Sequence, residues 1–170
     1  FWNEDRKRPL TQVNLSGVAF HEQLGSMEDK TQRISQLGPT LAEAWHLTDQ
    51  ETQWLTRACG LAKCDLVTTM VKEFPTLQGV MGKHYAAGEP PQVAQAIEEH
   101  YLPLAGKSPT TLIGQALAIL DKYDTLAGYF TIGIEPTGDK DPFGLRRAAQ
   151  GIIEVAWVAR CLTDFGGIWD

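Results

Sequence analysis

The sequence predicts an all-α fold, a bundle of roughly seven to nine helices. Apolar residues recur at helical spacing along most of the chain, and no useful length shows the alternation of a strand. Helix-start signals also recur, and glycine or proline separates the periodic segments. With 170 residues, the chain is expected to form a single domain, 1–170, that buries a substantial core.

The first third of the chain is expected to contain three helices. Pro9 suits a first helical turn, and the apolar pattern that follows predicts a helix over 10–24. A second helix is expected from residue 27. Because proline lacks an N–H and clashes with the preceding turn, Pro39 is expected to break or kink this helix near residue 37. A short third helix over 41–47 completes the segment.

The stretch 54–86 is the part around which the other helices are expected to pack. Thr48 and Glu51 form a capping box that opens a central helix, which is expected to run to about Lys63. Asp65 follows at the junction with a helix-like segment over 66–74. An aspartate at such a junction is expected to cap the free backbone N–H groups of the next helix.

Four more helices are expected in the second half. The first three are placed over 76–87, 92–101 and 110–130, and the third of these has a long apolar side. A loop rich in glycine, proline and aspartate follows. Asp141 is then expected to cap a last helix over 143–162, with a proline in its first turn.

Charge and composition exclude several classes of protein. The net charge of −6 disfavours a self-sufficient nucleic-acid binder, because phosphate neutralisation usually supplies most of that affinity. Any RNA contact is therefore expected to be local or shared with other domains, and no DNA partner is expected. No apolar run approaches the ~20 residues of a membrane-spanning helix, so no membrane partner is expected.

The cysteines and the ends of the chain indicate a cytoplasmic protein that is part of a longer polypeptide. The three cysteines lack the CxxC spacing of a metal site and are expected to be reduced, buried thiols: Cys59, Cys64 and Cys161. The chain begins without methionine and shows no signal-peptide pattern. We therefore expect an excised or processed fragment.

Four strings of the sequence resemble the β subunit of bacterial-type glycyl-tRNA synthetase. They are FHEQLGSMEDKTQR (20–33), LAKCDLVTTMVKEFPTLQGVMGKHYA (61–86), ALAILDKYDTLAGYFTIG (116–133) and PTGDKDPFGLRRAAQGI (136–152). The resemblance implies a fragment of the large subunit of an α2β2 enzyme that joins glycine to its tRNA with ATP. It implies glycine tRNA, the α subunit and the remaining β-subunit domains as partners. ATP and magnesium are expected at the α subunit, so no cofactor is expected in this chain.

The matched part of the family resembles the HD domains of metal-dependent phosphohydrolases, which hold a water-activating metal with His, a His-Asp pair and a distant Asp. By helix context these positions fall on Lys30, Cys64, Asp65 and Asp121. A charged ammonium cannot ligate a metal, so no metal site and no catalytic residue are expected. We hypothesise that Lys30 lies near Asp65 and Asp121 and offsets their charge. The alternative is a solvated Lys30 with Asp65 as a helix cap.

The histidines give little support to another active site. No two of His21, His84 and His100 have the spacing of an HExxH metal site, and packed or surface roles are more typical of single histidines. A serine hydrolase has no support, because no GxSxG motif occurs.

Cations at the start of the last helix form a candidate phosphate contact. Helix N-termini attract anions through their free N–H groups, and the adjacent Arg146 and Arg147 add positive charge. In the alternative interpretation, these arginines pair with Asp139, Asp141 or the carboxylates of another domain. The candidate RNA contacts are Lys72, Lys83, Lys140, Arg146 and Arg147.

Three classes of function remain. The first is a non-catalytic, degenerate HD-like module that contacts the acceptor arm of tRNA and contributes subunit architecture. The second is a purely structural scaffold, for which the acidic net charge is the best argument. The third is a residual metal-dependent phosphohydrolase, which only Asp65 and Asp121 support.

Overall fold

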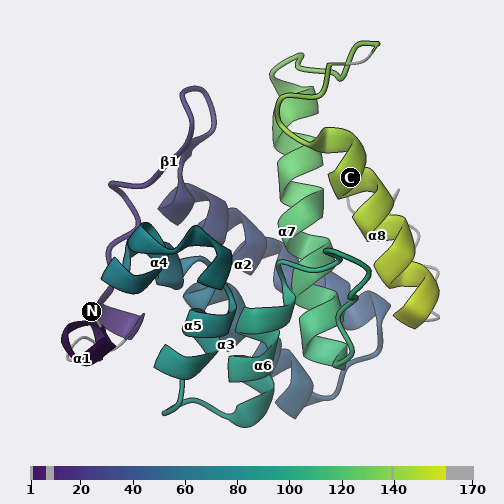
Figure 1. The fold of residues 1–170 in the computed structure, drawn as a ribbon. Helices are drawn as coiled ribbons and strands as arrows, with labels where there is room; N and C mark the ends of the chain where they lie inside the picture. The colour runs from purple at the N-terminus through teal and green to yellow at the C-terminus, as the bar shows by residue number, and fades with distance from the viewer. Residues whose placement is uncertain (1, 7–9, 139, 160–170) are drawn as a thin grey trace.

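The computed structural model describes residues 2–6, 10–138 and 140–159, and helices dominate it (Figure 1). The all-α prediction is confirmed. The α-helices of this part of the chain are α1 (Trp2–Asp5), α2 (Met27–Ala44), α3 (Asp49–Leu61), α4 (Thr69–Glu73), α5 (Val80–Tyr85), α6 (Pro91–Glu99), α7 (Leu112–Thr131) and α8 (Leu145–Ala159). Three short 3-10 helices join them: η1 (Leu10–Gln12), η2 (Cys64–Val67) and η3 (Pro75–Leu77).

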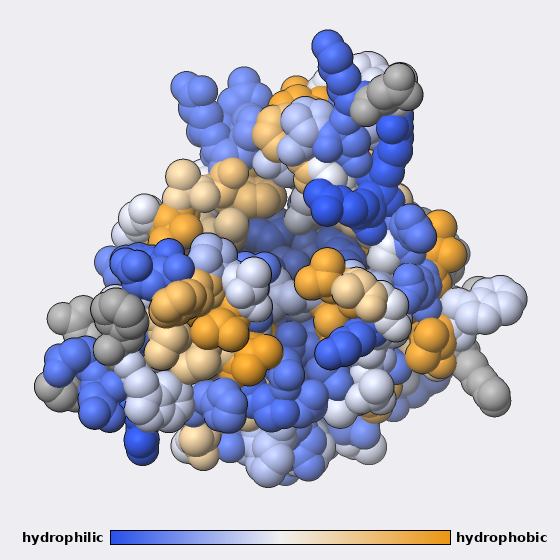
Figure 2. Space-filling view, in the orientation of Figure 1, coloured by the Kyte–Doolittle hydropathy of each residue, from blue (hydrophilic) through white to orange (hydrophobic). Residues whose placement is uncertain are grey.

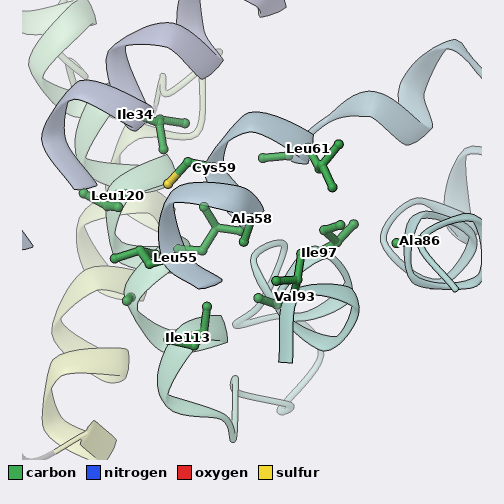
Figure 3. Close-up of a cluster of buried hydrophobic side chains, with 14 of the residues drawn as sticks. Ile34, Leu55, Ala58, Cys59, Leu61, Ala86, Val93, Ile97, Ile113 and Leu120 are labelled. Atoms are coloured by element: carbon green, nitrogen blue, oxygen red, sulfur yellow. The ribbon is translucent and has the colours of Figure 1, made fainter. Parts of the chain in front are cut away.

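Helix α7 is the longest of these helices and the one on which several others pack. It contacts α2, α3, α6 and α8, and α8 lies along its outer side (Figure 1). The main core forms where α2, α3, α6 and α7 meet. Figure 3 shows part of it, with side chains from all four helices pointing toward one another: Ile34, Leu55, Ala58, Cys59, Val93, Ile97, Ile113 and Leu120.

The predicted helix over 10–24 is wrong. After η1 the chain forms an antiparallel hairpin of β1 (Ala19–His21) and β2 (Gly25–Ser26). The Asn14 side chain accepts a hydrogen bond from the Ser16 backbone N–H at 2.7 Å, a local turn that competes with helix formation. Gly25 begins β2 with a φ of 82°, a conformation that glycine adopts without strain.

The prediction that Pro39 breaks this helix near residue 37 is wrong, because α2 continues from Met27 to Ala44, and the alternative of a kink at Pro39 stays a prediction. The expected helix over 41–47 is therefore mostly the end of α2. Ile34 and Leu41, which flank Pro39, are both fully buried. We infer that burial on both sides of the proline compensates for its missing N–H. Ser26 starts α2 with a capping box to Asp29.

The junction after α3 differs from the prediction in one important respect. The capping box of Thr48 and Glu51 is confirmed, but α3 ends at Leu61, and Lys63 adopts a left-handed conformation with a φ of 67°. The next α-helix, α4, is capped by Thr68, whose hydroxyl accepts from a backbone N–H. Asp65 is therefore not the cap of this helix, because its carboxylate faces the interior.

The later helices are confirmed with shifted ends. The segment 76–87 divides into part of η3 and α5, whereas α6 and α7 match two predicted helices closely. Asp141 caps the last helix as predicted, since its carboxylate accepts from the Leu145 and Arg146 N–H groups at 2.7 and 2.9 Å. Helix α8 begins at Leu145 rather than residue 143, and its predicted end at 162 lies outside the described residues.

The cysteines were expected to be reduced, buried thiols, and no helix was expected to span a membrane. Cys59 and Cys64 are buried free thiols, whereas Cys161 falls outside the described part of the chain. Burial raises the pKa of both described thiols to about 12, so they are unreactive. Among the helices that the structure describes, none has the length and apolar character needed to span a bilayer.

Candidate functional site

Lys30 is the centre of a buried cluster of charged side chains between α2 and α7. It is 2 % exposed. Its ammonium donates to the Asp121 carbonyl oxygen at 2.8 Å, to Asp124 Oδ2 at 3.1 Å and to Thr125 Oγ1 at 2.9 Å. The same nitrogen lies 3.3 Å from Asp121 Oδ1. The ammonium thus binds one turn of α7 through both backbone and side-chain oxygens.

Lys63 brings a second ammonium to Asp121 from the turn after α3. Its Nζ donates to Asp121 Oδ2 at 3.0 Å and lies 4.1 Å from the centre of the Tyr101 ring. The left-handed backbone at Lys63 ends α3 immediately before this contact. From the sequence, Lys63 marks only the expected end of the central helix, and no local pattern indicates that it is buried.

Asp124 is a second buried carboxylate that sequence reasoning did not place in the site. Arg33 holds it with two bonds, Nε to Oδ1 at 2.6 Å and Nη2 to Oδ2 at 3.1 Å. Lys30 and Arg33 are three residues apart on α2, as are Asp121 and Asp124 on α7. Residues at this spacing share a helix face, so the two matching pairs are a signal that could have predicted the contact.

Asp65 lies elsewhere in the cluster and has its own partners. Its Oδ2 accepts from the Gly79 backbone N–H at 2.6 Å, and its Oδ1 accepts from the Tyr101 hydroxyl at 2.9 Å. Asp65 therefore joins η2 to the start of α5 and to the residues after α6. The hypothesis that Lys30 offsets both aspartates is wrong for Asp65, because among the described residues the ion pairs of Lys30 within 4 Å are to Asp121 and Asp124. The alternative of a solvated Lys30 is also wrong.

The electrostatics of the cluster favour an ionised Asp121. Burial alone would raise the pKa of this carboxyl, but the Lys30 and Lys63 ammonium groups hold it well below the usual range. Burial lowers the pKa of Lys63, and the Asp121 charge opposes that effect. Lysine nitrogens therefore lie where a cation would have to lie to neutralise Asp121.

His100 is fully buried beside this cluster and stays neutral. Its Nδ1 lies 2.7 Å from the Ile97 carbonyl oxygen, and a carbonyl only accepts, so Nδ1 carries the proton. Burial and the nearby Lys63 lower the pKa of His100 well below 6.5. His21 packs against Tyr129, and His84 is exposed. In the described segments, no three His, Cys, Asp or Glu side chains are grouped to hold a metal ion.

Chemically, this arrangement neutralises the buried charge of Asp121 and Asp124 with the cations of α2 and of the turn after α3. Asp65 and Asp124 use both oxygens in bonds to protein donors, and Asp121 lies between two ammonium groups. A metal at Asp121 would have to displace the two lysine ammonium groups. Cys64, at the position predicted for the histidine of the pair, is a buried thiol.

The predicted RNA contacts lie on the surface and do not form one group. Lys72 on α4 is exposed, whereas Lys83 on α5 pairs with Glu98 at 2.7 Å. The other three surround the start of α8 and are all exposed; we call Lys140, Arg146 and Arg147 the cationic turn. Figure 2 shows hydrophilic residues gathered over this upper end of α7 and α8.

The alternative pairing of the arginines with Asp141 is wrong. Asp141 uses its carboxylate to cap α8, and Arg146 donates to the Gly138 carbonyl oxygen instead. Asp139 lies outside the described residues.

Comparison with known proteins identifies close relatives of the whole chain. Residues 1–168 match a family model described as the glycyl-tRNA synthetase beta subunit. The glycine–tRNA ligase beta subunit of Streptococcus agalactiae is 44% identical over 176 residues, covering 100% of this chain and 25% of the relative. That of Shouchella clausii is 51% identical over 161 residues, covering 91% and 23%. The chain thus spans about a quarter of the length of these curated relatives.

Removing a cation from the buried cluster is predicted to lower the free energy of unfolding far more than removing a cation from a surface ion pair. Lys30→Met leaves buried carboxylates short of a partner and is expected to lower the free energy of unfolding by about 3–5 kcal/mol. Arg57→Met removes an exposed pair with Glu89 and is expected to cost at most about 1 kcal/mol. Urea unfolding measures both values. Equal losses would show that the cluster contributes no more than a surface ion pair.

Because His100 is buried in its neutral form, we expect the folded chain to lose stability in mild acid. Its pKa is lower in the folded chain than in the unfolded chain, so only the unfolded chain takes up this proton as the pH falls below 6.5. The contribution is complete above that pH and is expected to decline by up to about 1.4 kcal/mol per pH unit below it. Urea unfolding between pH 8 and 5 tests this, with His100→Gln as the variant that lacks the effect. An NMR titration showing His100 protonated at pH 6 in the folded chain would contradict the prediction.

Proposed function

Since the chain belongs to the glycyl-tRNA synthetase beta subunit family, we propose that it is a non-catalytic helical module of a glycine–tRNA ligase that contacts glycine tRNA. The α subunit and the remaining β-subunit domains are its proposed protein partners, and the cytoplasm is its proposed location. ATP and magnesium are proposed to bind at the α subunit, outside this chain. The module would position tRNA by its acceptor arm for chemistry carried out elsewhere in the enzyme.

The buried cluster supports a degenerate HD-like origin for the module. The predicted positions for metal ligands hold Lys30, Cys64, Asp65 and Asp121, and the ammonium groups of Lys30 and Lys63 neutralise Asp121. Protein donors take both oxygens of Asp65. A residual phosphohydrolase is therefore the weakest of the three candidate functions.

The observation that carries the tRNA-binding proposal is the contrast between the inner and outer cations. Lys30 and Lys63 are buried in ion pairs, whereas the cationic turn is exposed and makes no ion pair within 4 Å to another described residue. Asp141 holds the start of α8 in place without neutralising the arginines. Exposed cations beside a helix N-terminus suit a local phosphate contact on a chain of acidic net charge.

Charge reversal in the cationic turn tests this proposal. We expect glycine tRNA to bind the chain at low salt, with an affinity that falls as the salt concentration rises. The double variant Arg146→Glu with Arg147→Glu is expected to weaken binding by about tenfold or more and to reduce the salt slope by about two. The single variant Arg57→Glu serves as the control, because it reverses the charge of an exposed residue on α3 rather than in the cationic turn. Fluorescence anisotropy measures all three affinities.

Two outcomes would contradict a tRNA-contacting role for this surface. One is binding that ignores ionic strength, because phosphate contacts release counterions. The other is an unchanged affinity in the double variant, which would favour a scaffold role for the cationic turn.

The outer face of α8 favours the scaffold as a second candidate function. Ile153, Trp157 and Val158 are 69 %, 80 % and 52 % exposed, and Figure 2 shows apolar residues along the edge over α8. Large apolar side chains that gather on one surface commonly mark an interaction site. Most of the length of the curated relatives lies outside the matched segment. We propose that this face packs against another part of the longer β subunit.

A charged substitution on this face separates the two candidate functions. Trp157→Glu is expected to abolish copurification of the chain with the remaining part of a family β subunit expressed as a separate polypeptide. Phe74→Glu, a similarly exposed aromatic position at the end of α4, is expected to leave copurification unchanged. Equal recovery of both variants would remove the support for α8 as the contact surface.

A further inference from the structure

Four ring-bearing side chains from three segments meet beside the cationic turn. Phe20 and His21 come from β1, Tyr129 from α7, and Phe143 from the residues before α8. Tyr129 and Phe143 stack with ring centres 4.5 Å apart and planes at 26°. His21 meets both rings edge-on, at 5.2 and 5.7 Å, and Phe20 meets Tyr129 edge-on at 5.6 Å. The contacts fix the plane of the Phe143 ring.

Phe143 is the exposed member of this group. Tyr129, beneath it, is 4 % exposed, whereas Phe143 is 42 % exposed. A single exposed aromatic residue is common and by itself indicates nothing. Here, however, one ring face is covered by a buried, stacked partner and His21 packs against the ring, so the exposed part of the ring faces solvent in a fixed orientation.

Cations lie on both sides of Phe143 in the sequence, and one of them lies next to it in the structure. Lys140 precedes it by three residues, and Arg146 follows by three. Gly144 has a φ of 68°, and a Cβ built on it would lie 3.1 Å from Arg147 Nη2, so this guanidinium lies next to the residue that follows Phe143. The Asp141 cap holds the start of α8 in place. An exposed ring flanked by positive charge is the arrangement that stacks a nucleobase and holds its phosphates.

We propose that Phe143 is a stacking platform for an unpaired base of RNA, and that the cationic turn binds the phosphates flanking that base. The inference rests on the proposed tRNA-contacting function and specifies the form of RNA. Bases within a duplex expose only their edges, because their faces are stacked on neighbours. The surface therefore takes a single-stranded segment or an unpaired end, and it accepts any of the four bases because each has an aromatic face.

Substitution of Phe143, read out on two forms of RNA, tests the platform. The probes are a fluorescent single-stranded oligoribonucleotide of about eight nucleotides and a blunt duplex of the same length. Phe143→Leu is expected to weaken binding of the single strand about 5- to 30-fold, consistent with loss of one stacked base. Its affinity for the duplex is expected to stay unchanged. Phe143→Tyr keeps the ring and is expected to bind as the parent chain does, as is Phe74→Leu at a distant exposed position.

A second measurement keeps the proposal falsifiable if Phe143→Leu fails to fold. An oligoribonucleotide that carries 2-aminopurine is expected to change its fluorescence on binding the parent chain, because stacking on an aromatic ring alters the emission of this base. Binding without such a change at any position of the probe would overturn the proposal.

The outcomes distinguish this proposal from the proposed function. If charge reversal at Arg146 and Arg147 weakens binding of both RNAs but Phe143→Leu weakens neither, the platform is wrong and the phosphate contact stands. If neither RNA binds at low salt, both proposals fail.

Discussion

Asp121 lies between two ammonium groups, with Lys30 Nζ 3.3 Å from one carboxylate oxygen and Lys63 Nζ 3.0 Å from the other. These contacts join α2, the turn after α3 and α7, the elements around which the main core forms. A buried charge without a partner is strongly unfavourable, so the three elements cannot separate without exposing or stranding one of these groups. The relative placement of the helices therefore depends on this ion cluster as well as on apolar packing.

The same constraint explains local features that are otherwise unusual. Lys63 adopts a left-handed backbone that costs energy in a residue with a Cβ, and its ammonium meets Asp121 immediately beyond the end of α3. Asp65 turns inward to the Gly79 N–H and the Tyr101 hydroxyl, and a hydroxyl from Thr68 caps α4 in its place. Lys30 and Lys63 therefore have a structural role. The cations that can contact a ligand are those outside the cluster.

Helical periodicity and capping boxes predicted most helices, because these signals are local. The hairpin before α2 was missed because a side-chain turn at Asn14 outweighs an apolar pattern. The continuity of α2 through Pro39 depends on burial of its neighbours, which no local signal shows. Lys30 and Asp121 were placed in one site through family resemblance, and the helical spacing of Asp121 and Asp124 could have added Asp124, whereas Lys63 joins the site through a tertiary contact alone.

Lysine nitrogens occupy the place of a cation beside the buried carboxylate of Asp121. The most direct test is a crystal structure of the chain soaked in Mn²⁺, with anomalous scattering used to locate the ion. The account predicts no anomalous peak beside Asp65 or Asp121, and both lysine nitrogens at ion-pair distance from Asp121. A peak coordinated by these carboxylates, with Lys30 or Lys63 displaced, would contradict it.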